Sequence, residues 1–393
     1  MPDRVLSLSV RSWLTTLVAF CLGISQITPA QTAAPEGISL PTDLRVQAPG
    51  WWPTKGERGR DEYVGSAACA KCHAEKAATY QITAMAHAAS RATASEMLHQ
   101  HNPLNLRIGQ FDYRVETSDE KSVLKISGDK SSVTEALLWA IGVGHMGQTY
   151  LYEQNGSSYE SHLSFFSEPK TLDITPGQPR SMPQTLENAA GRRLSSDETQ
   201  RCFGCHTTAA TTKNQFDPAN LFPGVTCEAC HGPGASHVAV AHSGEPTPGL
   251  IFNPARLNRV DAVDFCGACH RTWEDVVVGG LTGVGVFNVR FAPYRLENSK
   301  CWKKGDERIT CVACHDPHQP LVRDATSYDS RCLACHIVSP DKKRTASHPG
   351  GACPVSANKC VSCHMLAVDP PNLHSVFTDH WIRIVRKGAP YPD

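Results

Sequence analysis

A five-residue pattern, C-x-x-C-H, occurs seven times in this chain of 393 residues and constrains its fold more than any other feature. The chain has 17 cysteines and 18 histidines, far too few for seven copies to arise by chance. We number the copies as motifs 1 to 7, which occupy residues 69–73, 202–206, 227–231, 266–270, 311–315, 332–336 and 360–364.

In a C-x-x-C-H motif the two thiols attach one haem covalently and the adjacent histidine binds its iron. Zinc ribbons and disulfides also use C-x-x-C pairs, but neither requires a histidine after every second cysteine. The sequence therefore predicts seven covalently attached haem c groups. The cysteines that would attach them are Cys69, Cys72, Cys202, Cys205, Cys227, Cys230, Cys266, Cys269, Cys311, Cys314, Cys332, Cys335, Cys360 and Cys363. The proximal iron ligands would be His73, His206, His231, His270, His315, His336 and His364.

The first thirty residues have the pattern of a secretory signal peptide. Arg4 and Arg11 precede an apolar run over residues 13–24, and a cleavage site would fall before Gln31. An uncleaved anchor helix is the alternative, although the run is shorter than the ~20 residues that span a bilayer. We expect a periplasmic or otherwise exported protein with no transmembrane helix in the mature chain.

The spacing of the motifs suggests how the rest of the chain is divided. We expect a signal peptide (1–30), a Pro/Gly-rich linker (31–62), a first haem-binding segment (63–98), a β-rich insert (99–200) and a six-haem region (201–393). Haem groups would supply much of the apolar core. The expected fold class is therefore mainly α and irregular, a haem-cored multihaem cytochrome c with a small β-rich insert at about residues 102–180.

Local patterns predict two further elements. Residues 74–98 lack glycine and proline and should form a helix. Asn155-Gly156 lies between two runs of strand-forming residues, 148–154 and 157–166, which predicts a type I′ hairpin.

Eleven histidines lie outside the motifs and could supply second iron ligands. The candidates are His87, His145, His237, His318 and His374, with His380 as the alternative to His374. Only three residues separate His318 from His315, a reach of at most ~11 Å, so His318 would bind the haem of a neighbouring motif. The alternative is an exposed helix histidine for His87 and a polar loop residue for His237 and His318.

Cys301 and Cys353 remain after the motif cysteines and Cys21 of the predicted signal peptide are set aside. They could form a disulfide, or Cys301 could bind an iron as a thiolate.

Several segments resemble a known family. They are Tyr63-Val64-Gly65-Ser66 before motif 1, Met85-Ala86-His87-Ala88 after it, Val225-Thr226 with the run to His237, residues 311–318, and the tail over residues 360–381. They are similar to multihaem cytochromes c related to the tetrahaem cytochrome c-554 of ammonia oxidisers, in the superfamily of nitrite reductase and hydroxylamine oxidoreductase. The resemblance implies haems held in stacked pairs, with His87, His237 and His318 as distal ligands.

The charge balance bears on the partners. Lys and Arg number 38, as do Asp and Glu, and haem propionates would make the loaded protein about seven charges more negative. This disfavours nucleic acid and favours redox proteins with basic docking faces. We expect an electron carrier acting between redox partners or within a membrane-associated respiratory complex. The alternative is an oxidoreductase for a small nitrogen or sulfur compound at one five-coordinate haem; no catalytic residue is assigned.

Overall fold

The structure is a computed structural model, and it describes residues 59–144, 147–212, 215–246, 249–303, 305–336, 353, 356, 358–386, 388 and 391–392. The predicted signal peptide, most of the predicted linker and His145 lie outside the described residues. No helix in the described part of the chain combines the length and the apolar character needed to cross a bilayer.

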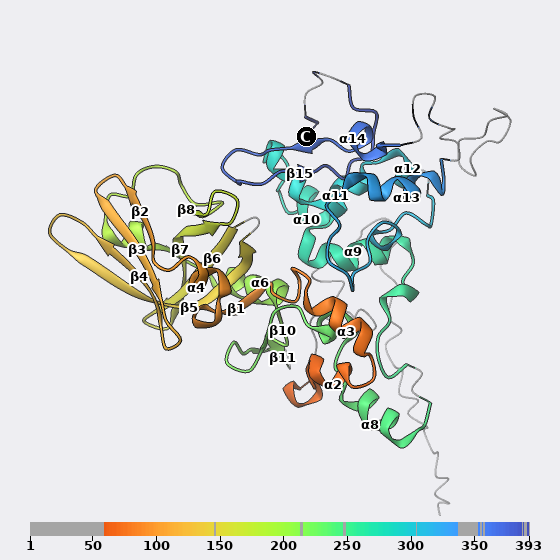
Figure 1. The fold of residues 1–393 in the computed structure, drawn as a ribbon, viewed down its shortest axis with the longest axis horizontal. Helices are drawn as coiled ribbons and strands as arrows, with labels where there is room; N and C mark the ends of the chain where they lie inside the picture. The colour runs from red at the N-terminus through yellow and green to blue at the C-terminus, as the bar shows by residue number, and fades with distance from the viewer. Residues whose placement is uncertain are drawn as a thin grey trace, which may run out of the picture. The chain divides into compact units, whose positions relative to one another are not determined.

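A nine-stranded antiparallel sheet is the largest element of the fold (Figure 1). Seven strands follow one another in the order β2-β3-β4-β5-β6-β7-β8, while β1 pairs with β5 and β9 pairs with β7. Strands β2 and β8 also contact each other, so the sheet curls into a nearly closed barrel. The strands are β1 (Ala89–Arg91), β2 (Leu104–Ile108), β3 (Phe111–Thr117), β4 (Ser122–Ser127), β5 (Ser132–Gly144), β6 (Gly147–Gln154), β7 (Ser157–Phe166), β8 (Thr171–Ile174) and β9 (Gly191–Arg193).

The sheet shows that the expected fold class, mainly α and irregular with a small insert, was wrong. The sheet starts before residue 102, at β1, and ends after residue 180, at β9. It also has its own hydrophobic core, which includes Tyr113, Ile126 and Phe165. This core consists of side chains from successive strands, so the segment does not depend on haem for its interior.

The predicted hairpin is confirmed. Strands β6 and β7 pair across Asn155 and Gly156, whose φ angles are 49° and 71°. Both central residues of a type I′ turn need positive φ, which asparagine and glycine adopt most readily.

Short helices carry most of the motifs. The α-helices are α2 (Ser66–Ala70), α3 (Ala74–Gln81), α4 (Glu96–Gln100), α5 (Leu186–Ala190), α6 (Ser196–His206), α7 (Cys227–His231), α8 (Ala235–Ser243), α9 (Arg259–His270), α10 (Trp273–Val277), α11 (Ala292–Glu297), α12 (Lys300–Lys303), α13 (Asp329–Leu333) and α14 (Cys360–His364). The 3-10 turns are η1 (Arg60–Glu62), η2 (Ala92–Ala94), η3 (Pro254–Arg256), η4 (Gly285–Arg290), η5 (Cys311–Ala313) and η6 (Ala325–Tyr328). Two-residue strands form three further small pairs: β10 (Thr207–Thr208) with β13 (Phe222–Pro223), β11 (Thr211–Thr212) with β12 (Gln215–Phe216), and β14 (Ala367–Val368) with β15 (Phe377–Thr378).

The helix predicted for residues 74–98 is wrong beyond its first two turns. Helix α3 ends at Gln81, and the chain then turns and enters β1. The side chain of Thr83 accepts a hydrogen bond from the backbone N–H of Ala86 at 3.2 Å. Such a local bond competes with the helical backbone pattern.

Candidate haem-binding sites

Each motif forms about one helical turn, which brings its reactive side chains together. The first cysteine, the second cysteine three residues on and the histidine four residues on share one face of such a turn. The backbone N–H of His73 donates to the carbonyl of Cys69 at 2.9 Å, and His315 does the same to Cys311 at 3.0 Å. The local sequence therefore presents two thiols and one imidazole to the same side.

Three motif histidines face a second histidine from elsewhere in the chain. The ring centroids of His73 and His237 lie 6.4 Å apart with 21° between the ring planes. Those of His231 and His318 lie 6.0 Å apart at 11°. For His315 and His380 the values are 6.2 Å and 45°.

These spacings fit an iron ion bound between two imidazoles. A metal–nitrogen bond is about 2 Å long and the nitrogen lies about 1 Å from its ring centroid, so two rings on opposite sides of one metal lie about 6 Å apart. The residues therefore fit a haem iron at motifs 1, 3 and 5, with His237, His318 and His380 on the distal side.

Hydrogen bonds set the orientation of several motif histidines. Nδ1 lies within hydrogen-bonding distance of a backbone carbonyl in His206 (Ala88, 3.1 Å), His231 (Phe252, 2.9 Å) and His364 (Arg383, 3.1 Å). When Nδ1 carries the proton and donates it to the carbonyl, Nε2 keeps its lone pair for a metal. The surroundings of these histidines therefore suit an iron ligand.

Burial keeps other imidazoles in the neutral form that binds metal. It lowers the pKa of His206, His270 and His315. Burial, with a smaller contribution from His315, lowers the pKa of His380 to about 4. A neutral imidazole does not have to lose a proton before it binds iron.

The motifs adjoin one another. Thiols of different motifs lie near each other and shift each other's pKa in four pairs, namely Cys69 with Cys227, Cys205 with Cys269, Cys266 with Cys311, and Cys332 with Cys360. These pairs join motif 1 to 3, 2 to 4, 4 to 5, and 6 to 7. Burial and the nearby Cys266 raise the pKa of Cys230 to about 12, so motif 3 lies close to motif 4. Cys332 adds to the raised pKa of Cys314, so motif 5 lies close to motif 6. All seven motifs thus belong to one connected series.

A buried carboxylate connects the surroundings of motifs 1 and 3. Glu228, inside motif 3, is only 1% exposed. Its Oε1 accepts hydrogen bonds from the backbone N–H groups of Val64 (2.9 Å) and Gly234 (2.8 Å), and its Oε2 accepts one from Gly65 (2.7 Å). Because Gly234 leads into the helix that carries His237, this side chain fixes both sides of the His73–His237 pair.

Residues of α3 and of the loop after motif 5 surround His318. The carboxylate of Asp316 lies 3.4 Å from Nδ1 of His318, and the ring of Tyr80 meets the His318 ring edge-on at 6.4 Å. The Tyr80 hydroxyl donates to the carbonyl of Val225 at 2.5 Å, and burial raises the pKa of Tyr80 above its ordinary range. These contacts place His318, which follows motif 5, next to motif 3. Its short sequence separation from His315 predicts a position beside another motif.

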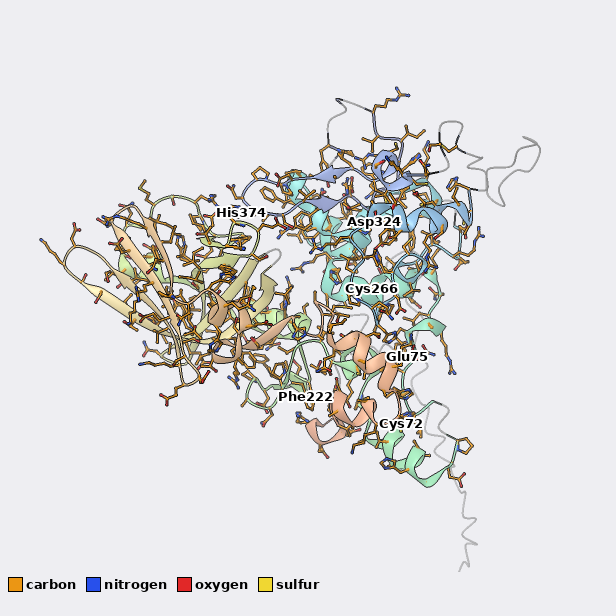
Figure 2. The ribbon with its side chains drawn as sticks, in the orientation of Figure 1. Cys72, Glu75, Phe222, Cys266, Asp324 and His374 are labelled. Carbon is orange, nitrogen blue, oxygen red and sulfur yellow. The ribbon has the colours of Figure 1, made fainter. Side chains whose placement is uncertain are left out.

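The remaining candidate histidines make other contacts. His87 is exposed and its Nε2 lies 2.7 Å from the carbonyl of Gln81. His374 follows motif 7, and its Nε2 lies 2.7 Å from the carboxylate of Asp173 on β8 (Figure 2). Of the two tail histidines, His380 is thus the one that faces a motif histidine. Cys301 lies on α12, where burial raises the pKa of its thiol.

Comparisons with known proteins agree with this chemistry. Residues 155–232, which contain motifs 2 and 3, match the family of cytochrome c554 and c-prime. The match covers less than half of the chain. No curated protein sequence is similar enough to count as a relative.

One solved structure is similar, the outer cell wall cytochrome OcwA. The identity is 15%, the TM-score is 0.46, and the aligned part covers 82% of this chain and 80% of that chain. A likeness of this size carries no argument about function. The motifs and the family match support the same class, a c-type cytochrome with covalently bound haem.

Proposed function

We propose that this protein is an exported heptahaem cytochrome c that passes electrons between redox partner proteins through neighbouring haem sites. The main observation behind the proposal is that a second histidine ring faces the motif histidine at motifs 1, 3 and 5. The ring centroids of each pair lie 6.0 to 6.4 Å apart. An iron with imidazole on both sides has no open position for a substrate, and it accepts and releases single electrons.

The connected series of motifs supports transfer along the chain rather than chemistry at one centre. Motifs 1, 3, 4, 5, 6 and 7 follow one another as neighbours, and motif 2 adjoins motif 4. Electrons entering at one end of such a series would find a next site at each step. The pattern of residues 1–30 supports export, and the negative charge of a loaded protein supports partners with basic docking faces.

In this proposal the chain's own residues hold each iron in place. The motif cysteines attach the haems, and the seven motif histidines bind the irons proximally. His237, His318 and His380 bind distally at motifs 1, 3 and 5. His87 and His145 remain candidates for other irons, whereas His380 takes the role that the sequence gave to His374.

The proposal is tested on protein made in a host that matures c-type cytochromes. The intact mass should equal the processed chain plus seven haems, and the oxidised protein should be dominated by low-spin iron. Stopped-flow mixing with a reduced redox protein should reduce all haems without added substrate. A mass that lacks the haems would refute the cofactor assignment. A dominant high-spin signal that shifts on adding nitrite, hydroxylamine or sulfite would favour the oxidoreductase instead.

A further inference from the structure

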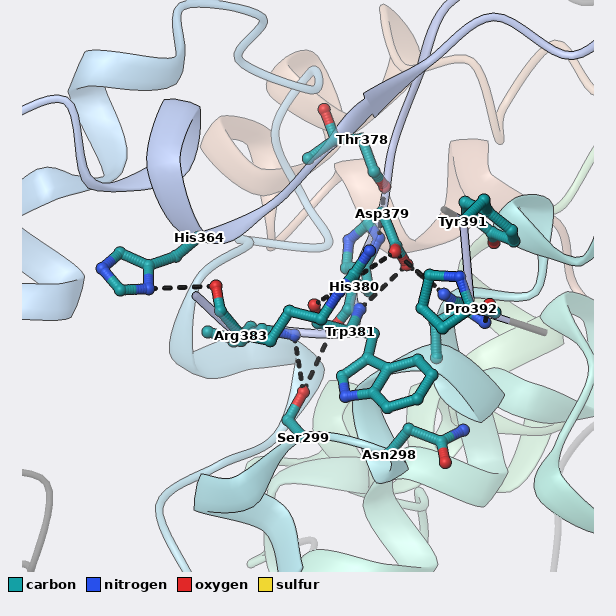
Figure 3. Close-up of polar contacts among 12 residues, drawn as sticks. Asn298, Ser299, His364, Thr378, Asp379, His380, Trp381, Arg383, Tyr391 and Pro392 are labelled. Atoms are coloured by element: carbon teal, nitrogen blue, oxygen red, sulfur yellow. Dashed lines mark hydrogen bonds and ion pairs between the residues drawn. The ribbon is translucent and has the colours of Figure 1, made fainter. Parts of the chain in front are cut away.

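A fully buried ion pair lies beside the distal histidine proposed for motif 5, and Figure 3 shows its carboxylate, Asp379, next to His380. Arg295 on α11 and Asp379 after β15 are both 0% exposed. The guanidinium donates from Nε to Oδ1 at 2.8 Å and from Nη2 to Oδ2 at 2.9 Å. This two-point contact fixes the carboxylate in position and in orientation.

The remaining polar atoms of the pair also have partners. Arg383 donates to Oδ2 of Asp379 at 2.6 Å, and the backbone N–H of Trp381 donates to Oδ1 at 3.0 Å. Nη1 of Arg295 donates to the carbonyl of Pro392 at 3.0 Å. Buried charges require this degree of pairing, because each unpaired one carries a large desolvation cost.

The cluster holds the backbone on both sides of His380. Before it, the N–H of Asp379 donates to the carbonyl of Leu366 at 2.8 Å. The hydroxyl of Ser299, close to α11, donates to the carbonyl of His380 at 3.2 Å and accepts from the N–H of Ile382 at 2.8 Å. The Nδ1 of His380 lies 3.0 Å from the carbonyl of Thr378, which leaves Nε2 for the motif side.

Helix α11 itself packs against α9, the helix that ends in motif 4. The ion pair therefore connects the tail that carries His380 to the helix next to motif 4. The His380 ring faces His315 of motif 5 at 6.2 Å.

We propose that Asp379, held by Arg295, is a positioning residue that keeps the His380 imidazole opposite His315 as an iron ligand. This rests on the proposed ligand role of His380. The carboxylate of Asp379 acts on His380 through the backbone, because the side chains of adjacent residues leave the chain in different directions. If the ion pair is lost, we expect the iron at motif 5 to lose its distal imidazole ligand.

The experiment compares four variants with the unaltered protein, all in the haem-loaded form. His380→Ala reports the spectrum of motif 5 without its distal ligand. Asp379→Asn keeps the shape of the side chain and removes its charge. Arg295→Gln combined with Asp379→Asn removes the pair without stranding either charge, in case the single variant does not fold. Glu160→Gln is the matched control, because it removes the carboxylate that pairs with Arg192 at 2.8 Å on the sheet strand β7.

We expect His380→Ala to convert the equivalent of one haem from low-spin to high-spin, as measured by electron paramagnetic resonance and absorption. Asp379→Asn or the double variant should give the same component in part or in full, and added imidazole should restore the low-spin form. Glu160→Gln should leave the spectrum unchanged. Imidazole rescue separates a positioning role from general unfolding, which added ligand would not reverse.

Two results would count against the inference in different ways. If His380→Ala left the spectrum unchanged, the proposed ligand role of His380 would be wrong. If His380→Ala gave the high-spin component but the folded Asp379 variants did not, the ligand would stand and the positioning role of Asp379 would be refuted.

Discussion

The carboxylate of Glu228 should control how firmly the His73–His237 pair is held. It accepts three hydrogen bonds from backbone N–H groups, two on Oε1 and one on Oε2. Glu228→Gln keeps a carbonyl oxygen that can accept the hydrogen bonds from the backbone N–H groups of Val64 and Gly234. Its amide group cannot accept the bond from Gly65, so one bond to a charged acceptor is lost.

The magnitude follows from that single bond. A hydrogen bond to a charged group contributes about 1.5–3 kcal/mol net, so the fraction of molecules with His237 off its iron should rise roughly 10- to 150-fold. Glu228→Ala removes both acceptor oxygens and leaves the three backbone donors unpaired. At about 1–3 kcal/mol each, this loss approaches the whole stability of a typical domain.

Cyanide trapping measures this fraction directly. Cyanide reaches the iron of motif 1 only when His237 has left it, so the trapping rate follows the open population. Glu228→Gln should accelerate the slow phase assigned to motif 1, which His237→Ala identifies by making it fast. Glu120→Gln, an exposed glutamate, serves as the control. A trapping rate equal to that of the unaltered protein would refute the view that Glu228 holds this pair.

Three further predictions concern other parts of the chain. His318→Ala should convert one haem equivalent to high-spin iron, reversible by imidazole in an absorption titration. Hydrogen bonds from the backbone of Ser195 and from Arg192 lower the pKa of Glu198 from 4.5 to about 2. The cap of α6 should therefore stabilise the protein fully above pH 4.5, and this stabilisation should be lost as the pH falls toward 2. Glu198→Gln should remove this acid-side loss of hydrogen-exchange protection in α6. Ile126→Ala should lower the stability of the sheet by about 2–5 kcal/mol, seen in far-ultraviolet circular dichroism, with the haem absorption unchanged at temperatures below unfolding.

The sequence reveals the motif side of each site because that side is local. Two cysteines and a histidine within five residues need only one helical turn to come together, as motif 5 shows. The distal side is not local. His237 meets His73, and His380 meets His315, through long-range packing that no short pattern encodes.

His318 is the instructive intermediate case. Its short separation from His315 argued against a shared iron and directed attention to another motif. Only the structure identifies the facing histidine as His231. For His374 and His380 the sequence offered no physical basis for choosing between them, because the choice depends on the contacts of Asp173 and Asp379.

The sheet was underestimated for a different reason. Alternation and the Asn155-Gly156 turn identified its central hairpin, but the pairing of β1 with β5 and of β9 with β7 links strands distant in the sequence. Irregular register between β5 and β6 also interrupts the alternation that would have marked a long strand. The assumption that haem would supply the core then made a separate side-chain core appear unnecessary.

The thiol contacts between motifs have a consequence for biogenesis. The thiols of Cys69 and Cys227 lie near each other, and the neighbouring Cys69 lowers the pKa of Cys227, which favours its reactive thiolate. An oxidant that reached this pair first would cross-link two attachment points and spoil two sites at once. Maturation of such a chain therefore has to keep its thiols reduced until each is alkylated, and the close spacing that serves conduction makes the timing of assembly critical.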